Sequence, residues 1–194
     1  MVDQTEPGRR VASAAGPWSE VVRASRYVLS APHAAAQVRD GTPKRAEEAT
    51  RDLALQLSAQ LGWSAIHTEP EQRGDPNWDE GSPYLERLAA WHDDVVVVDL
   101  HVMRPRGVDL CLGLGQEPER ASRLYPGLVA AAVRSGYPLA LNWPFSAGPR
   151  TITSQLQRRG REALQVEISY TCLDAERYDQ TVAVLRDGLA AVVA

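Results

Sequence analysis

The stretch VVVVDLHVM, Val95 to Met103, decides the fold class of this chain. Four consecutive valines suit a strand that is buried on both faces, as in the centre of a parallel sheet covered by helices. Asp99 and His101 follow the apolar run, where the strand ends. In open α/β sheets, ligands and catalytic groups gather at the carboxyl ends of the strands. The stretch therefore predicts a central strand that delivers polar side chains to a site.

Strand-like and helix-like segments alternate on both sides of this central strand. Leu53, Leu57 and Leu61 show the helical spacing of apolar residues, and Gly62 follows where a helix C-cap belongs. The alternation predicts an α/β fold: a single three-layer domain, with a mixed, mostly parallel sheet and helices on both faces. We expect strands at 26–31, 63–69, 95–103, 108–115, 138–145, 151–156 and 163–170, and helices at 44–62, 84–91, 118–136 (interrupted at Pro126) and from Asp174 onward.

Length and charge limit the classes of protein to which the chain can belong. The 194 residues suffice for one domain, which we place at 17–194, after a flexible N-terminal tail at 1–16. The net charge is −4 and no apolar run could cross a bilayer, so neither nucleic acid nor a membrane is an expected partner. No signal peptide is visible at the N-terminus. We therefore expect a cytoplasmic protein whose two cysteines, Cys111 and Cys172, are buried thiols.

Two histidines and several carboxylates lie at or near the expected strand ends. His33 follows the first strand, His101 ends the valine strand, and Glu167 lies within strand 163–170. Two histidines and a carboxylate are a common ligand set of catalytic zinc, which keeps a fourth position open for water. A carboxylate that is not a ligand, for which Glu167 is the candidate, can then move the water proton to a leaving amine. Asp99 can orient His101 through the second ring nitrogen.

Four segments of the chain resemble, in the same order, segments of the N-formylglutamate amidohydrolase family. They are SAPHAAAQVRDGTPKRAEEATRDLA (30–54), VVVVDLHVM (95–103), LNWPFSAGPRTIT (141–153) and ALQVEISY (163–170). The resemblance implies a phosphorylase/hydrolase-like fold of the zinc carboxypeptidase and aspartoacylase type. It also implies a zinc-dependent amidohydrolase that cleaves an N-acyl, N-formyl-type, amino acid or a similar small acidic amide.

The resemblance implies roles for individual residues. His33 and His101 would bind one Zn²⁺ per chain, and Glu167 would be the catalytic carboxylate. Zinc carboxypeptidases have a glutamate ligand three residues after the first histidine, where this chain has Ala36. Some relatives have instead a glutamate followed three residues later by threonine at a helix start, and Glu47 with Thr50 matches that arrangement.

Two points about this metal site stay open at the level of sequence. Glu48 and Asp40 are alternatives to Glu47 as the third ligand. Iron, manganese and cobalt are alternatives to zinc, because the same ligand types bind all of them.

Arginines and an asparagine near these motifs are candidates for binding a small substrate with a carboxylate. A planar guanidinium pairs well with a carboxylate, and Arg104, Arg150 and Asn142 lie in the segments MRPRG and NWPFSAGPR. The turn-rich loop 74–86 is expected to lie over the site. No oligomeric state is predicted.

Two other functions compete with the small-molecule amidohydrolase. The alanine at position 36 motivates a catalytically weak or inactive binding protein on the same fold. A peptide or cell-wall amidase is the third hypothesis, because short loops would admit a larger substrate.

Overall fold

The valine-rich stretch forms β7, a central strand of an eight-stranded sheet with the order β1-β2-β6-β3-β7-β10-β8-β9. The structure is a computed structural model in which residues 9–12 and 16–192 are described. β7 runs parallel to β3 on one side and to β10 on the other, while β2 and β8 run antiparallel to their inner neighbours. The predicted mixed, mostly parallel sheet is confirmed. The strands are β1 (Arg9–Ala12), β2 (Trp18–Val22), β3 (Tyr27–Ala31), β6 (Ser64–Thr68), β7 (Val96–Met103), β8 (Leu110–Gly113), β9 (Leu139–Leu141) and β10 (Glu162–Ser169).

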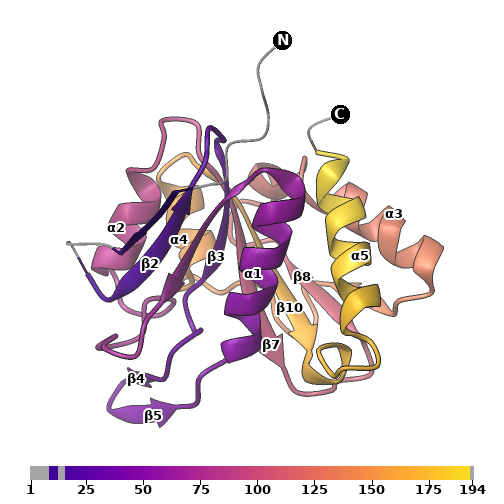
Figure 1. Cartoon of the computed structure of the whole chain (residues 1–194), viewed down its shortest axis with the longest axis horizontal. Helices are drawn as coiled ribbons and strands as arrows, with labels where there is room; N and C mark the ends of the chain where they lie inside the picture. The colour runs from indigo at the N-terminus through magenta and orange to yellow at the C-terminus, as the bar shows by residue number, and fades with distance from the viewer. Residues whose placement is uncertain (1–8, 13–15, 193–194) are drawn as a thin grey trace.

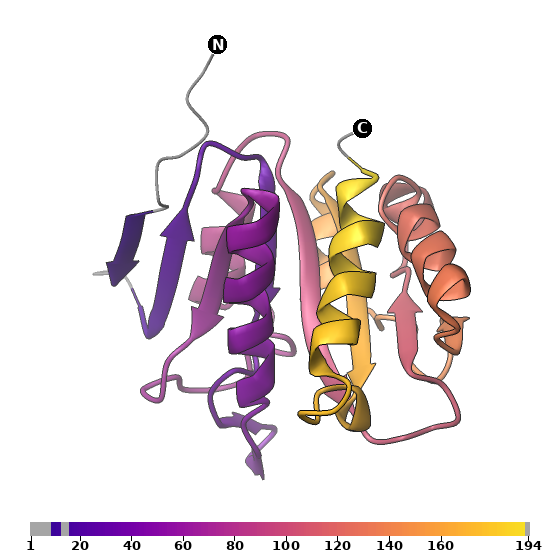
Figure 2. The same cartoon turned by 45° about the vertical axis from the view of Figure 1, so that its right-hand side comes forward.

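Helices cover both faces of this sheet, as predicted. Figures 1 and 2 show α1 (Glu48–Leu61), α3 (Tyr125–Ser135) and α5 (Tyr178–Ala190) on one face. The shorter helices α2 (Pro83–Ala89) and α4 (Ile152–Arg158) cover the other face. The remaining described elements are a small hairpin of β4 (Gln37–Arg39) and β5 (Thr42–Lys44) and the 3-10 turns η1 (Pro118–Ala121) and η2 (Tyr170–Cys172).

Alternation along β7 explains both the valine run and the position of the polar residues. Val96, Val98 and Leu100 pack into the core under α1, α3 and α5, whereas Val97 packs with α2 and α4. Because successive side chains of a strand point to opposite faces, Asp99 and His101 lie on the α2/α4 face. The site therefore lies on the face that carries the two short helices.

Residues 151–156, predicted as a strand, form most of α4 instead, so that prediction is wrong. The β-branched residues of TITSQL favour a strand locally. Thr151, however, caps the helix, because its side chain accepts a hydrogen bond from the Ser154 amide. Ile152 and Leu156, about one helical turn apart, then face the core together.

Other boundaries differ from the prediction by a few residues. α1 begins at Glu48 rather than at 44, since residues 42–44 pair with β4. α5 begins at Tyr178 rather than at Asp174, whose carbonyl accepts two amides in a turn. Pro126 lies in the first turn of α3, and residues 122–124 separate α3 from η1. Arg9–Ala12 pairs with β2 at the sheet edge, which differs from the predicted tail at 1–16; residues 1–8 and 13–15 lie outside the described residues.

No helix among the described residues is both long enough and apolar enough to cross a membrane.

Both cysteines are free and buried, as predicted. Burial raises the pKa of each thiol, and with the nearby Asp109 carboxylate it raises the pKa of Cys172 to about 12. Since the thiolate is the reactive form, we expect folded protein at about pH 8 to bind less than a tenth of an equivalent of a thiol reagent such as Ellman's reagent. The denatured chain should bind two equivalents, one for each cysteine. Rapid modification of the folded protein would contradict this environment.

Candidate metal centre

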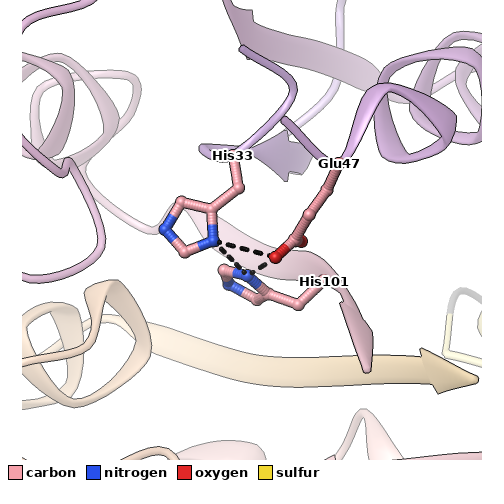
Figure 3. A group of neighbouring side chains, drawn as sticks. All are labelled: His33, Glu47 and His101. Carbon is pink, nitrogen blue, oxygen red and sulfur yellow. Dashed lines mark hydrogen bonds and ion pairs between the residues drawn. The ribbon is translucent and has the colours of Figure 1, made fainter. Parts of the chain in front are cut away.

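Three segments far apart in the chain bring His33, Glu47 and His101 together at the carboxyl edge of the sheet (Figure 3). β3 and β7 are parallel neighbours, with Ser30 paired to Asp99, so His33 and His101 end up side by side. Glu47 immediately precedes α1, and its backbone amide donates a hydrogen bond of 2.7 Å to the His33 carbonyl. That bond holds the start of α1 against the segment that follows β3.

The potential ligand atoms of these residues all lie within 4.8 Å of one another. The Nδ1 atoms of the two histidines are 3.2 Å apart. Glu47 Oε1 is 3.3 Å from His33 Nδ1, and Glu47 Oε2 is 3.7 Å from His101 Nδ1. Tetrahedral ligands with zinc bonds of about 2.0–2.2 Å are about 3.3–3.6 Å from each other. The spacing and the chemistry of these donors therefore fit a metal ion.

Two buried aspartates fix the orientation of the imidazole rings. Asp99 Oδ2 is 3.0 Å from His101 Nε2, and Asp75 Oδ1 is 2.8 Å from His33 Nε2. Asp99 is in turn held by the Ser30 hydroxyl, which donates to its Oδ1 at 2.9 Å. A carboxylate on the outer nitrogen favours the tautomer in which that nitrogen carries the proton. Nδ1 of each ring is then left as a lone-pair donor that faces the other ring and Glu47.

The charges within this group depend strongly on each other. Burial opposes charge on His101, but the Asp99 and Glu47 carboxylates outweigh burial and hold the pKa of His101 well above its usual value. Burial likewise opposes charge on Glu47, yet its contacts with His101 and His33 hold the pKa of Glu47 far below its usual value. The site therefore has an ionised carboxylate beside two imidazoles. The same carboxylates would attract a metal ion that is bound in place of the imidazole protons.

Glu167 lies next to this group on the neighbouring strand. It pairs in register with His101 on β7, and alternation along β10 places it on the α2/α4 face with Gln165. The Gln165 amide donates a 2.7 Å hydrogen bond to Glu167 Oε1. Burial raises the pKa of Glu167, even though the charge of nearby His101 opposes the shift. A buried carboxylate whose pKa is raised is suited to taking and returning a proton.

The alternatives for the third ligand lie elsewhere. Glu48 is exposed on the first turn of α1. Asp40 accepts a 2.8 Å hydrogen bond from Trp78 Nε1. Among the described residues, only the group of His33, Glu47 and His101 has the spacing of a metal site.

The three residues predicted to bind substrate occupy different environments. Asn142 Oδ1 accepts a hydrogen bond from the Leu114 amide, which ties two loops together. Arg150 Nε donates to the Trp78 carbonyl at 3.0 Å, and the guanidinium lies 4.4 Å from the centre of the Trp78 ring. Arg104 is exposed just beyond the end of β7.

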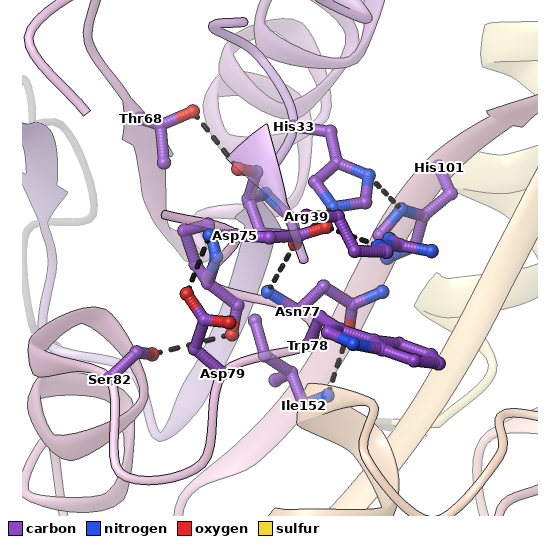
Figure 4. A network of polar contacts seen from close by, with 12 residues as sticks. His33, Arg39, Thr68, Asp75, Asn77, Trp78, Asp79, Ser82, His101 and Ile152 are labelled. Carbon is purple, nitrogen blue, oxygen red and sulfur yellow. Dashed lines mark hydrogen bonds and ion pairs between the residues drawn. The ribbon is translucent and has the colours of Figure 1, made fainter. Parts of the chain in front are cut away.

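Sequence reasoning did not find the role of Asp75. The loop 74–86 was predicted to lie over the site, and from this loop Asp75 reaches His33 (Figure 4). Asp75 Oδ2 also accepts a 2.6 Å hydrogen bond from Arg39 Nε, and its Oδ1 accepts one from the Asn77 amide. The contacts of Asp75 with Arg39 and His33 join residues 36 and 42 positions apart, so no local pattern could have revealed them.

Because Asp99 orients His101, we expect Asp99→Asn to weaken zinc affinity by about 10–100-fold. An asparagine keeps the shape but removes the charge that stabilises the metal-binding tautomer. Glu86→Gln, at an exposed glutamate that pairs with Arg159, is the matched control and should leave zinc affinity unchanged. Competition with a chromophoric chelator measures both variants. Equal affinities of Asp99→Asn and the parent would remove Asp99 from the site.

About half of the chain matches a known protein family. The family model of N-formylglutamate amidohydrolase matches residues 82–173, which include three of the four segments that carry the resemblance. No curated protein matches the chain by sequence.

Several solved structures share the fold. N-formylglutamate amidohydrolase from Ralstonia eutropha JMP134 superposes with a TM-score of 0.59 at 16% identity, over 91% of this chain and 95% of that chain. A bacteriophage poly-gamma-glutamate hydrolase superposes with a TM-score of 0.56 at 14% identity, over 94% and 90%. The apo, zinc-free form of YNDL superposes with a TM-score of 0.54 at 18% identity, over 91% of each chain.

The family and two of these neighbours are named as hydrolases, and the family name specifies an amide bond. Residues 82–173 therefore match the N-formylglutamate amidohydrolase family model, and the chain has the fold of a solved N-formylglutamate amidohydrolase, as the resemblance predicted.

Proposed function

We propose that the protein is a zinc-dependent amidohydrolase that cleaves the acyl–nitrogen bond of a small N-acyl amino acid. The observation that carries the proposal is the convergence of His33, Glu47 and His101 beside the buried Glu167. The family and the structural neighbours supply the reaction class. The zinc-free form of one neighbour supports the choice of metal.

His33 Nδ1, His101 Nδ1 and one oxygen of Glu47 would hold the ion. With zinc held there, the scissile carbonyl would be polarised and the pKa of a bound water molecule would be lowered, so that the water could attack near neutral pH. Asp75 and Asp99 keep the two Nδ1 atoms available by holding the ring protons on Nε2.

Glu167 is proposed to move the proton. Gln165 donates to its Oε1, while no described residue donates to Oε2. Oε2 can therefore take the proton of the attacking water and return it to the nitrogen of the leaving amine. Burial raises the pKa of Glu167, which favours acceptance of the proton by this carboxylate.

The test is a panel of amides given to zinc-loaded protein. N-formyl and N-acetyl amino acids should be hydrolysed with release of the free amine, and removal of zinc by a chelator should stop the reaction. Binding of these amides without turnover would favour instead a catalytically inactive protein on the same fold.

A polymer substrate is the second candidate, and exposed aromatic residues support it. Trp143 and Phe145 are 56% and 38% exposed. They lie near Glu167, because Cys111 pairs with Glu167 in the sheet and contacts the Phe145 carbonyl. Such rings can bind a longer chain. Faster turnover of poly-γ-glutamate or of peptidoglycan fragments than of N-acyl amino acids would favour this function.

A further inference from the structure

Arg39 is connected to the metal-site histidine through a single carboxylate. Asp75, which is fully buried, accepts from Arg39 Nε at 2.6 Å and contacts His33 Nε2 at 2.8 Å. The Arg39 side chain is 28% exposed. Figure 4 shows the three side chains in one network with His101. The guanidinium is therefore held beside the centre by a short, rigid link.

Most of the hydrogen-bonding capacity of Arg39 is unused. Four other arginines among the described residues bind a carboxylate through two of their nitrogen atoms; they are Arg87 with Glu20, Arg159 with Glu86, Arg177 with Asp109 and Arg186 with Asp187. Arg39 uses Nε alone, and no described residue accepts a hydrogen bond from its Nη1 or Nη2. These two nitrogens form the edge of the guanidinium that binds a carboxylate in a planar, bidentate manner.

Trp78 supports this guanidinium from the side. The Arg39 guanidinium carbon lies 4.7 Å from the centre of the Trp78 ring, a cation–π distance. The ring itself is fixed, because Nε1 donates to Asp40 and the Trp78 carbonyl accepts from Arg150. Arg39 is thus held at Nε by Asp75 and across its face by the indole. Such preorganisation lowers the entropy cost of binding a ligand.

We propose that Arg39, seated on Trp78 and held by Asp75, binds a carboxylate group of the substrate through Nη1 and Nη2. This inference rests on the proposed function and identifies the acidic substrate class of the same site. It assigns to Arg39 the role that sequence reasoning gave to Arg104, Asn142 and Arg150. Asn142 is occupied with the Leu114 amide, and Arg150, unlike Arg39, has an ion pair at Nη2, which lies 3.9 Å from Asp40 Oδ1.

The experiment measures the binding of N-formyl-L-glutamate to zinc-loaded protein by calorimetry. Arg39→Gln and Arg39→Lys are compared with Arg134→Gln, a variant of an exposed arginine in the last turn of α3. We expect Arg39→Gln to weaken binding at least tenfold and Arg134→Gln by less than twofold. Arg39→Lys should fall between them, since it keeps the charge and loses the planar fork. The zinc content of each variant shows whether Asp75 still supports His33.

Two further ligands distinguish recognition of the carboxylate from a structural role. In N-formyl-L-glutamine and N-formyl-L-isoglutamine, an amide replaces one carboxylate of the ligand. One of these two ligands should bind to the parent as weakly as N-formyl-L-glutamate binds to Arg39→Gln. For that ligand, Arg39→Gln should bind no more weakly than the parent does. Equal weakening by Arg39→Gln for all three ligands would overturn the proposal.

Failure of this inference is distinguishable from failure of the proposed function. Tight binding of N-formyl-L-glutamate by both the parent and Arg39→Gln would overturn the role of Arg39 alone. If the zinc-loaded parent does not bind N-formyl-L-glutamate, the role of Arg39 is also overturned. If the same preparation hydrolyses an uncharged amide, the proposed amidohydrolase function still holds.

Discussion

Glu167→Gln is expected to keep about one zinc ion per chain and to lower kcat at least about a hundredfold, the lower end of what general acid–base catalysis contributes. The substitution keeps the shape of the side chain and its contact with Gln165 but removes the proton acceptor. The Michaelis constant should change little, because Glu167 acts on the water and on the leaving amine. Amine release under saturating substrate measures the effect.

Glu162→Gln is the matched control for this prediction. Glu162 lies at the start of the same strand and pairs with Arg123 at 2.9 Å, away from the centre. This variant should keep full activity. Undiminished kcat in Glu167→Gln would show that another group moves the proton, and loss of zinc would show that Glu167 binds the metal.

Glu47→Ala is expected to lower zinc affinity by more than about a hundredfold. This loss is larger than the usual loss of affinity when a residue that only orients a metal ligand is replaced. The carboxylate is the one negative ligand in the proposed set. Its Oε2 also accepts a 2.9 Å hydrogen bond from the Val102 amide, which aligns it with His101. Chelator competition at fixed pH measures the affinity.

Glu48→Ala, which removes the carboxylate of the next residue in the chain, is the matched control for Glu47→Ala. Since Glu48 is exposed, its loss should leave zinc affinity unchanged. Equal affinities for the two variants would mean that Glu47 is not a ligand. A stronger effect of Glu48→Ala would reverse the assignment.

The sequence was sufficient to predict the parts of the site that depend on strand ends. A run of four valines predicts a strand buried on both faces, and the parallel neighbours of that strand bring His33 and His101 to one edge. Glu47 precedes a helix in a recognisable pattern, and Glu167 lies in register with His101. The family resemblance was needed to choose Glu47 over Glu48.

The contributions of loops could not be predicted in the same way. Asp75 meets His33 and Arg39 only because a turn-rich loop folds back over the sheet. The conformation of such a loop depends on tertiary contacts rather than on periodicity. α4 shows the same limit, since its local β-propensity is overridden by a cap at Thr151 and by the packing of Ile152.

The metal content of untagged protein, measured beside the double variant His33→Ala, His101→Ala, decides whether the two histidines bind a metal ion. We expect about one zinc ion per chain in the parent and none in the variant. Absence of bound metal in the folded parent, even after zinc is supplied, would contradict this expectation. The convergence of His33, Glu47 and His101 would then be a buried polar network without a metal.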